Sequence, residues 1–226
     1  MRIFRPTRSP EDWRQLLADP VKHWRTGYSA KALAHCWQEA GDFPAEVRDA
    51  FRNSGIDVFH NVEMLAAFPE HKVPLPGGRR PSQNDLFVVA KGNGELMSIM
   101  VEGKVSEPFG DTVAEWKGAY GKGKQRRLQY LCDLLELSPA EVDHIRYQLL
   151  HRTASAVIEA EGFNAPNAVM LVHSFSPRNE WFDDYQRFVA LFGATGELGT
   201  IVSARTVSGV KLYVGWVKGN GKYLNV

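Results

Sequence analysis

The chain has 226 residues, of which 44% are hydrophobic and 23% are charged, and its formal net charge at pH 7 is +1. This composition is typical of a globular protein and excludes collagen-like, low-complexity and disordered chains. No apolar run approaches the roughly 18 residues that a membrane-spanning helix needs, and no secretory signal peptide is recognisable at the N-terminus. We therefore expect a cytoplasmic protein with no membrane partner.

Serine-proline pairs predict where several helices begin. Such a pair places a hydroxyl at the N-cap and proline at the first helical position, and it occurs at residues 9, 138 and 176. The pair at residue 138, with Glu141 three residues later, predicts a helix of about twenty residues that ends near Gly162. Ser29 and Asp42 are weaker starts and predict two further helices before residue 55.

Apolar segments separated by turn residues predict the strands. Residues 71–75, 85–90 and 96–105 form a meander, with turns at residues 76–78 and 91–94. Residues 168–173 follow a long helical stretch, so they predict a buried strand parallel to an earlier one. Residues 198–206 and 210–217 close the chain as a hairpin. The expected fold class is α/β, with a mixed sheet flanked by helices.

Polar residues stand at the ends of two neighbouring strands in this meander. Asp85 begins the second strand, and Glu102-Gly103-Lys104 ends the third. Residues two apart on a strand share a face, so Glu102 and Lys104 point to the same side. An in-register hairpin brings Asp85 to the end of the neighbouring strand, and the two carboxylates and the lysine therefore converge.

Two carboxylates close together repel each other unless a cation lies between them, which favours a hard ion such as Mg²⁺ or Mn²⁺. Such an ion can polarise a phosphodiester and lower the pKa of a bound water. Lys104 could then orient the water or offset developing negative charge. The alternative is an ordinary ion pair between Glu102 and Lys104 at a sheet edge.

Two further triplets share the acid-x-Lys pattern. Glu115-Trp116-Lys117 lies in a predicted helix, where residues two apart point about 200° apart, so its charges cannot converge. Glu70-His71-Lys72 remains a weak competitor, because its upstream acids are limited to Asp57 and Glu63.

With Asp85 followed by Glu102-Gly103-Lys104, residues 56–175 resemble the PD-(D/E)XK nuclease superfamily, and the chain is also similar to a bacterial protein family grouped with it. The resemblance implies a restriction-endonuclease-like fold in which Asp85, Glu102 and the Gly103 carbonyl hold the metal. Glu63 is the match for an additional glutamate on the first core element. The sequence departs from the pattern before the aspartate, where Asn84 stands and the nearest proline is Pro81.

Gln148 and Arg152 lie four residues apart and share a helix face, resembling the Gln or Arg that some members place beside the site. A solvated helix face is the alternative. The domain division that follows is an N-terminal helical lobe, residues 1–55, and a nuclease-like domain, residues 56–226.

A basic segment without acids covers residues 117–127. We expect Lys122, Lys124 and Arg126, together with Arg152, to contact nucleic-acid phosphates, although such a run is equally typical of a solvated surface. Residues 118–125 superficially match a phosphate-binding P-loop, but Gln125 replaces the hydroxyl residue that ligates Mg²⁺.

These patterns predict a metal-dependent nuclease whose catalytic residues are Asp85, Glu102, Lys104, Glu63 and Gln148. Its partner would be nucleic acid, with DNA favoured, and a homodimer is compatible with the sequence. The main alternative is a non-catalytic nucleic-acid-binding or protein-interaction module on the same fold. Nucleotide hydrolysis at residues 118–124 is a third hypothesis.

Overall fold

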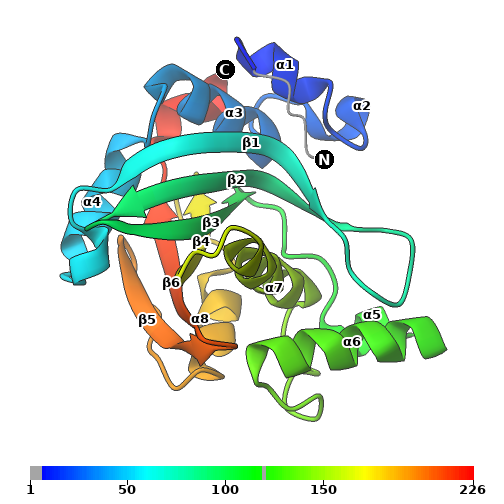
Figure 1. Ribbon diagram of the computed structural model, residues 1–226. Coiled ribbons are helices and arrows are strands. Elements are labelled where there is room, and N and C mark those ends of the chain that lie inside the picture. The colour runs from blue at the N-terminus through cyan, green and yellow to red at the C-terminus, as the bar shows by residue number, and fades with distance from the viewer. Residues whose placement is uncertain (1–6, 119–120) are drawn as a thin grey trace.

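A six-stranded mixed sheet forms the centre of the molecule in the computed structural model, which describes residues 7–118 and 121–226 (Figure 1). The strand order is β1-β2-β3-β4-β6-β5. The strands are β1 (Glu63–Val73), β2 (Ser82–Gly92), β3 (Glu95–Lys104), β4 (Asn167–Ser174), β5 (Thr200–Val207) and β6 (Val210–Lys218). The first three pair antiparallel, β4 is parallel to both β3 and β6, and β5 and β6 close an antiparallel hairpin. The predicted mixed α/β sheet is confirmed.

Helices cover both faces of the sheet (Figure 1). They are α1 (Pro10–Arg14), α2 (Pro20–His23), α3 (Ser29–Ala40), α4 (Ala45–Asn53), α5 (Val113–Lys117), α6 (Lys122–Leu135), α7 (Tyr147–Gly162) and α8 (Phe182–Ala190), with 3₁₀ turns η1 (Asp57–Phe59) and η2 (Gly221–Asn225). None of these helices combines the length and apolar character that crossing a bilayer requires.

Alternate residues of the central strands enter two separate hydrophobic cores. Phe87 and Met100 pack with the core that contains α7, whereas Leu86 and Ile99 pack with the core that contains α3 and α4. Strands buried on both faces form nearly continuous apolar runs, which is why β2 and β3 are recognisable in the sequence.

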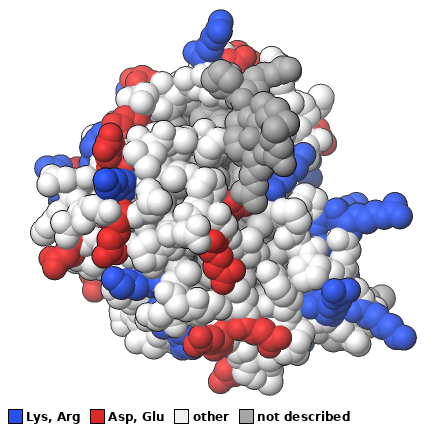
Figure 2. All heavy atoms as spheres, viewed as in Figure 1, with Lys and Arg blue, Asp and Glu red and all other residues white. Residues whose placement is uncertain are grey.

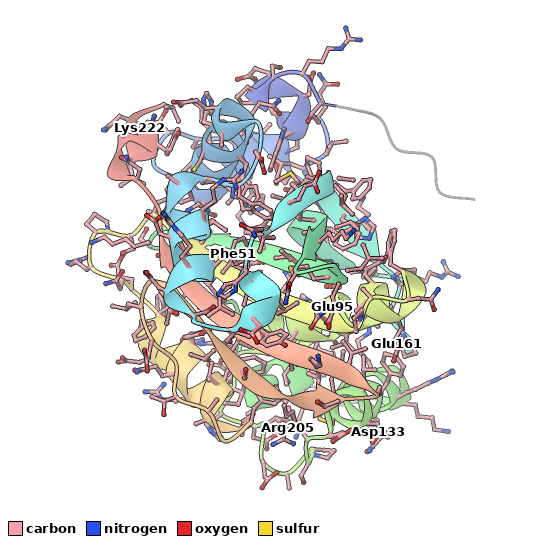
Figure 3. All side chains as sticks on the ribbon, turned by 60° about the vertical axis from the view of Figure 1, so that its left-hand side comes forward. Phe51, Glu95, Asp133, Glu161, Arg205 and Lys222 are labelled. Atoms are coloured by element: carbon pink, nitrogen blue, oxygen red, sulfur yellow. The ribbon has the colours of Figure 1, made fainter. Side chains whose placement is uncertain are left out.

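The N-terminal helices form a layer of the sheet domain. Leu33 of α3 and Phe51 of α4 share one hydrophobic core with the strands, and Phe51 stacks on Phe59 at 5.4 Å between ring centroids (Figure 3). The C-terminal turn η2 carries Lys222 to the same side, where its Nζ lies 2.6 Å from Glu39 Oε1 (Figure 3). The domain division after residue 55 stays a prediction, but these helices and the sheet share a core.

Two element boundaries differ by eight residues or more from the sequence-based expectation. Strand β1 begins at Glu63 instead of residue 71, because the apolar residues 64–68 also belong to this edge strand, where their side chains alternate between exposed and half-buried. Helix α7 begins at Tyr147 instead of Ser138. The intervening segment pairs with the start of α5, through a Val113 N–H bond to the Ile145 carbonyl and a Thr112–Arg146 bridge. This pairing of distant segments prevails over the local capping signal.

The loop between β1 and β2 is fixed to the start of α6. Gly77 has φ +79°, and a Cβ built on it would lie 2.1 Å from the Gly123 carbonyl oxygen. Arg127 of α6 donates from Nε to the Pro76 carbonyl and from Nη2 to the carbonyls of Leu75 and Arg80. We call this the hairpin clamp. It depends on the missing side chains of Gly77 and Gly123.

The hairpin clamp predicts a difference between two glycine substitutions. Gly94 has φ +85°, but a Cβ added to it would meet no atom within 4 Å, so Gly94→Ala carries only the left-handed backbone cost, about 1–2 kcal/mol. Gly77→Ala adds overpacking against Gly123, about 1–3 kcal/mol more. Denaturant unfolding of both variants checks this, and equal losses of stability would contradict the close contact.

Candidate active site

Strands β2 and β3 part at the residues that the sequence singled out. Their pairing ends at Leu86 and Val101, and beyond it the Gly103 N–H donates to Asp85 Oδ2 at 2.8 Å. The Lys104 carbonyl bonds to Phe175 N at 2.7 Å on the β4 side. Neighbouring residues of a strand present their backbone groups to opposite sides, so the Gly103 carbonyl is directed to the β2 side, toward Asp85.

Glu102 is the centre of a buried ion-pair network. Its Oε1 accepts from Lys104 Nζ at 2.6 Å and its Oε2 accepts from Arg152 Nε at 2.5 Å. Gln148 Oε1 also accepts from Lys104 Nζ, at 3.1 Å. The structure therefore brings Gln148 and Arg152 of α7 to the strand ends. Arg152 is only 7% exposed, so it serves this cluster and not a surface contact.

The acid supplied by the first strand is Glu70, and the structure does not bring Glu63 to the cluster. Glu63 is exposed and pairs with Lys91 at the far end of β1, about 20 Å along the strand from Glu70. Glu70 stands opposite Asp85, because its neighbours Pro69 and His71 pair with Leu86 and Asn84. Its Oε2 accepts from Gln83 Nε2 at 2.6 Å. The weak competitor triplet Glu70-His71-Lys72 thus contributes its acid to the same site.

These side chains line a cavity of about 650 Å³. Its walls combine the three carboxyl residues with aromatic rings and with residues from the α1–α2 region. They include Glu70, Asp85, Glu102, Leu17, Lys22, His23, Phe109, Trp116 and Tyr147. A concave site with convergent polar groups is the usual setting for ligand binding.

The three carboxyl groups differ in their ionisation. Burial raises the pKa of Asp85 well above its ordinary value, and the negative charges of Glu102 and Glu70 raise it further. Burial also raises the pKa of Glu70, to about 7. For Glu102 burial acts in the same direction, but Arg152 and Lys104 outweigh it and lower the pKa. The cluster therefore holds three acids against two cations, and an additional cation would be favourable.

His151 is a member of the cavity wall that sequence reasoning missed. Its Nδ1 lies 2.8 Å from Ser82 Oγ and 3.4 Å from Arg152 Nη1. Arginine can only donate, so Nδ1 is the accepting nitrogen. Burial and the nearby Arg152 charge hold the pKa of His151 well below its ordinary value, so the ring is neutral at pH 7. His151 and Ser82 therefore support the position of the Arg152 guanidinium.

The donor set fits a hard divalent cation. Carboxylate oxygens of Asp85, Glu102 and Glu70 and the Gly103 carbonyl are the ligand types that Mg²⁺ and Mn²⁺ prefer. Both Glu102 oxygens already accept from cationic side chains. Metal binding would therefore compete with Arg152 or Lys104 for this carboxylate.

A second group of metal-ligating types does not fit a metal. Potential ligand atoms of Cys36, Glu46 and His173 lie within 4.8 Å of one another. Trp37 Nε1–H donates to His173 Nδ1 at 3.1 Å, so the neutral ring carries its proton on Nε2 and donates it to Glu46 Oε1 at 3.3 Å. The His173 ring therefore has no lone pair available for a metal. Burial raises the pKa of the Cys36 thiol far above neutral, so the thiol is protonated as well. The group is a hydrogen-bonded connection between α3, α4 and β4.

The basic positions of the sequence analysis have different surroundings. Lys122 and Arg126 are exposed on α6. Lys124 instead donates from Nζ to the carbonyls of Trp116 and Lys117, at 2.7 and 3.1 Å, and so satisfies the end of α5. This use of Lys124 disfavours a nucleotide site at residues 118–124, of which residues 119 and 120 lie outside the described residues.

Glu70 predicts a distinct pH dependence of stability. A pKa of about 7 in the fold, above the ordinary 4.5, means that ionisation of Glu70 opposes folding. The wild-type protein should lose stability as pH rises from about 4.5 through 7, and Glu70→Gln should remove this loss, about 3 kcal/mol. Denaturant unfolding in EDTA between pH 5 and 8 measures it. Glu63→Gln is the matched control, and identical profiles for both variants would contradict the assignment.

Glu46 predicts the opposite dependence. Burial raises its pKa, but hydrogen bonds from His173, its own backbone amide and Asn220 outweigh burial and lower the pKa to about 2. Its stabilisation is therefore present above pH 4.5 and lost as pH falls toward 2. Glu46→Gln should lower the free energy of unfolding at pH 7 by about 1–2 kcal/mol and flatten the acid limb. An unchanged acid limb, equal to that of the exposed control Glu197→Gln, would refute this.

Comparison with known proteins adds a family and no activity. No curated protein matches the chain, and no solved structure matches it. A family model covers residues 6–221, which include the whole sheet, its helices and the carboxylate cluster. The chain therefore belongs to this family, which is described as a domain of unknown function, DUF6946.

Proposed function

We propose that the protein is a metal-dependent phosphodiester hydrolase that acts on nucleic acid, with DNA as the favoured substrate. The observation that carries the proposal is the parting of β2 and β3, where Asp85 accepts from the Gly103 N–H and lines a cavity together with Glu102. Lys104 shares that wall. The resemblance to PD-(D/E)XK nucleases rests on these same four residues.

The cluster supplies ligands for a divalent ion. Asp85, Glu102 and the Gly103 carbonyl would hold Mg²⁺ or Mn²⁺, and Glu70 takes the position for which the sequence offered Glu63. When bound, such an ion polarises a phosphodiester and generates a nucleophilic water at neutral pH.

Lys104 is suited to orient the attacking water or to meet a phosphoryl oxygen. Its ammonium has three donors, and Glu102 and Gln148 accept two of them, which leaves one for a ligand in the cavity. The Phe109 ring, 4.8 Å from Nζ, restricts the ammonium from another side. Within the described residues the Gln148 amide nitrogen has no acceptor, so it can donate to the same water, and Arg152, which lines the cavity, can donate to a phosphate there.

The proposal predicts loss of cleavage under conditions in which the variants remain folded, and Glu102→Gln also lowers stability because Lys104 and Arg152 lose their charged partner. Asp85→Asn and Glu102→Gln should each lower Mg²⁺-dependent cleavage of DNA or RNA oligonucleotides about 10²–10⁴-fold. Each variant removes a negative charge that would hold the metal ion at the reacting phosphate. Lys104→Met should act in the same direction. A divalent-metal titration against a panel of substrates, with thermal unfolding alongside, measures both properties.

Glu63→Gln is the control for this experiment, because Glu63 lies at the far end of β1. Its cleavage rate should equal the wild-type rate. Wild-type activity in both Asp85→Asn and Glu102→Gln would remove the proposed mechanism.

One observation favours a second candidate, a nucleic-acid-binding module without catalysis. Arg152 and Lys104 together occupy both oxygens of Glu102, and an ion pair of this kind can replace a metal permanently. Binding should then survive the double variant Asp85→Asn/Glu102→Gln. Salt-dependent binding with no cleavage in either Mg²⁺ or Mn²⁺ would favour this candidate over the hydrolase.

A further inference from the structure

Two basic segments far apart in the sequence lie together at the hairpin clamp. Residues 72–81 form the loop side of the β1–β2 hairpin, residues 116–118 end α5 and 122–127 begin α6, and the sequence has no acid in 72–81 or in 116–127. The Gly77–Gly123 contact and the three hydrogen bonds of Arg127 hold the two backbones against each other. Cations on the two segments therefore belong to one surface.

Some cations of this surface have protein partners and others do not. Lys117 pairs with Asp143, while Lys124 and Arg127 donate to backbone carbonyls. Five others are exposed, and the ranges 7–118 and 121–226 contain no carboxylate in ion-pair distance of them; Lys72 lies within β1, and the other four lie on the β1–β2 loop and α6. We call these four the basic ridge: Arg79, Arg80, Lys122 and Arg126.

Figure 2 shows Lys and Arg side chains projecting on the right-hand side of the molecule, over the β1–β2 loop and α6. The acidic side chains of this face gather mainly elsewhere. The net charge of the whole chain is close to zero, but this face carries a local excess of positive charge (Figure 2).

The elements that carry or hold the basic ridge also contribute to, or act on, the wall of the active-site cavity. The hairpin that carries Arg79 and Arg80 also carries Glu70 and Gln83, which line the cavity. On the helical side, the Arg127 charge acts on the ionisation of Tyr147 and His151, which line it as well. Trp116 stacks on Tyr147 with ring centroids 4.0 Å apart, and both rings line the cavity.

We propose that the basic ridge is a track for the phosphate backbone of a nucleic-acid strand and leads it toward the cavity. The inference rests on the proposed function and names how that site takes its substrate. Four cations without carboxylate partners repel one another, and successive phosphates relieve this repulsion. Arginine binds phosphate with two parallel hydrogen bonds, and the hairpin clamp fixes the backbones that present the side chains. Recognition through the backbone carries no base preference.

The test is the salt dependence of oligonucleotide binding in EDTA, where no turnover occurs. Fluorescence anisotropy with a labelled single strand and a labelled duplex would compare wild type with Arg79→Gln/Arg80→Gln and with Lys122→Gln/Arg126→Gln. Each double variant should reduce the slope of log K against log salt by about 1.4 for the single strand and about 1.8 for the duplex. Affinity at low salt should fall at least about tenfold.

The matched control is Lys91→Gln/Lys211→Gln, which removes the same charge at the opposite end of the sheet. Its slope should equal that of the wild type. Equal effects of the control and ridge variants, unchanged slopes in the ridge variants, or absence of binding by the wild type would each overturn the inference. Loss of binding to phosphatidylserine vesicles alone, with oligonucleotide binding intact, would overturn it in favour of a membrane surface.

Cleavage assays separate this inference from the proposed function. Ridge-dependent binding by a protein that cleaves nothing would leave the track in place and remove the hydrolase. Cleavage with the same KM in wild type and both ridge variants would leave the hydrolase and remove the track.

Discussion

The arrangement of the site depends on the burial of one carboxylate. Glu102 is 2% exposed, and a charge removed from water in this way is stable only when cations meet both of its oxygens. Lys104 comes from its own strand and Arg152 comes from α7, so the ion pairs join the sheet to the helix that covers it. The same helix face then places Gln148 and His151 at the cavity. A structural contact and the polar wall of the site are therefore one feature.

The balance of charges distinguishes this cluster from an ordinary buried ion pair. Two cations would be neutralised by two acids, but Glu70 and Asp85 join Glu102, and burial raises the pKa of both. The connection of Glu46 with His173 is the opposite case, because each donor there meets an acceptor and the pKa of the acid is lowered. Native structures satisfy their buried polar groups unless a functional site requires otherwise, so the excess of acid favours a ligand at the first cluster.

Local periodicity was sufficient to predict much of the site and failed where pairing between segments decides the outcome. The alternation of side chains along a strand predicted that Glu102 and Lys104 share a face, and the spacing of four residues on a helix predicted the same for Gln148 and Arg152. The structure does not bring Glu63 to the cluster, because β1 extends from Glu63 to Val73 and Glu63 lies at the end remote from Glu70. Counting residues outward from the turn at Gly77 and Gly78 would have placed Glu70 opposite Asp85. The helix expected from Ser138 failed because that segment pairs with the start of α5.

The basic ridge shows the same limit for charge. A net charge of +1 argues against binding through bulk electrostatics, and the run at residues 117–127 indicated only half of the surface. Arg79 and Arg80 join it because two glycines allow backbones 46 residues apart to touch, a contact that composition cannot reveal. Within that run, the Lys124 ammonium donates to a backbone carbonyl at the end of α5. The electrostatic potential near the cavity therefore depends on which cations the fold pairs with protein groups. Counting charges along the sequence includes cations that are already paired and misses cations that the fold brings in from distant segments.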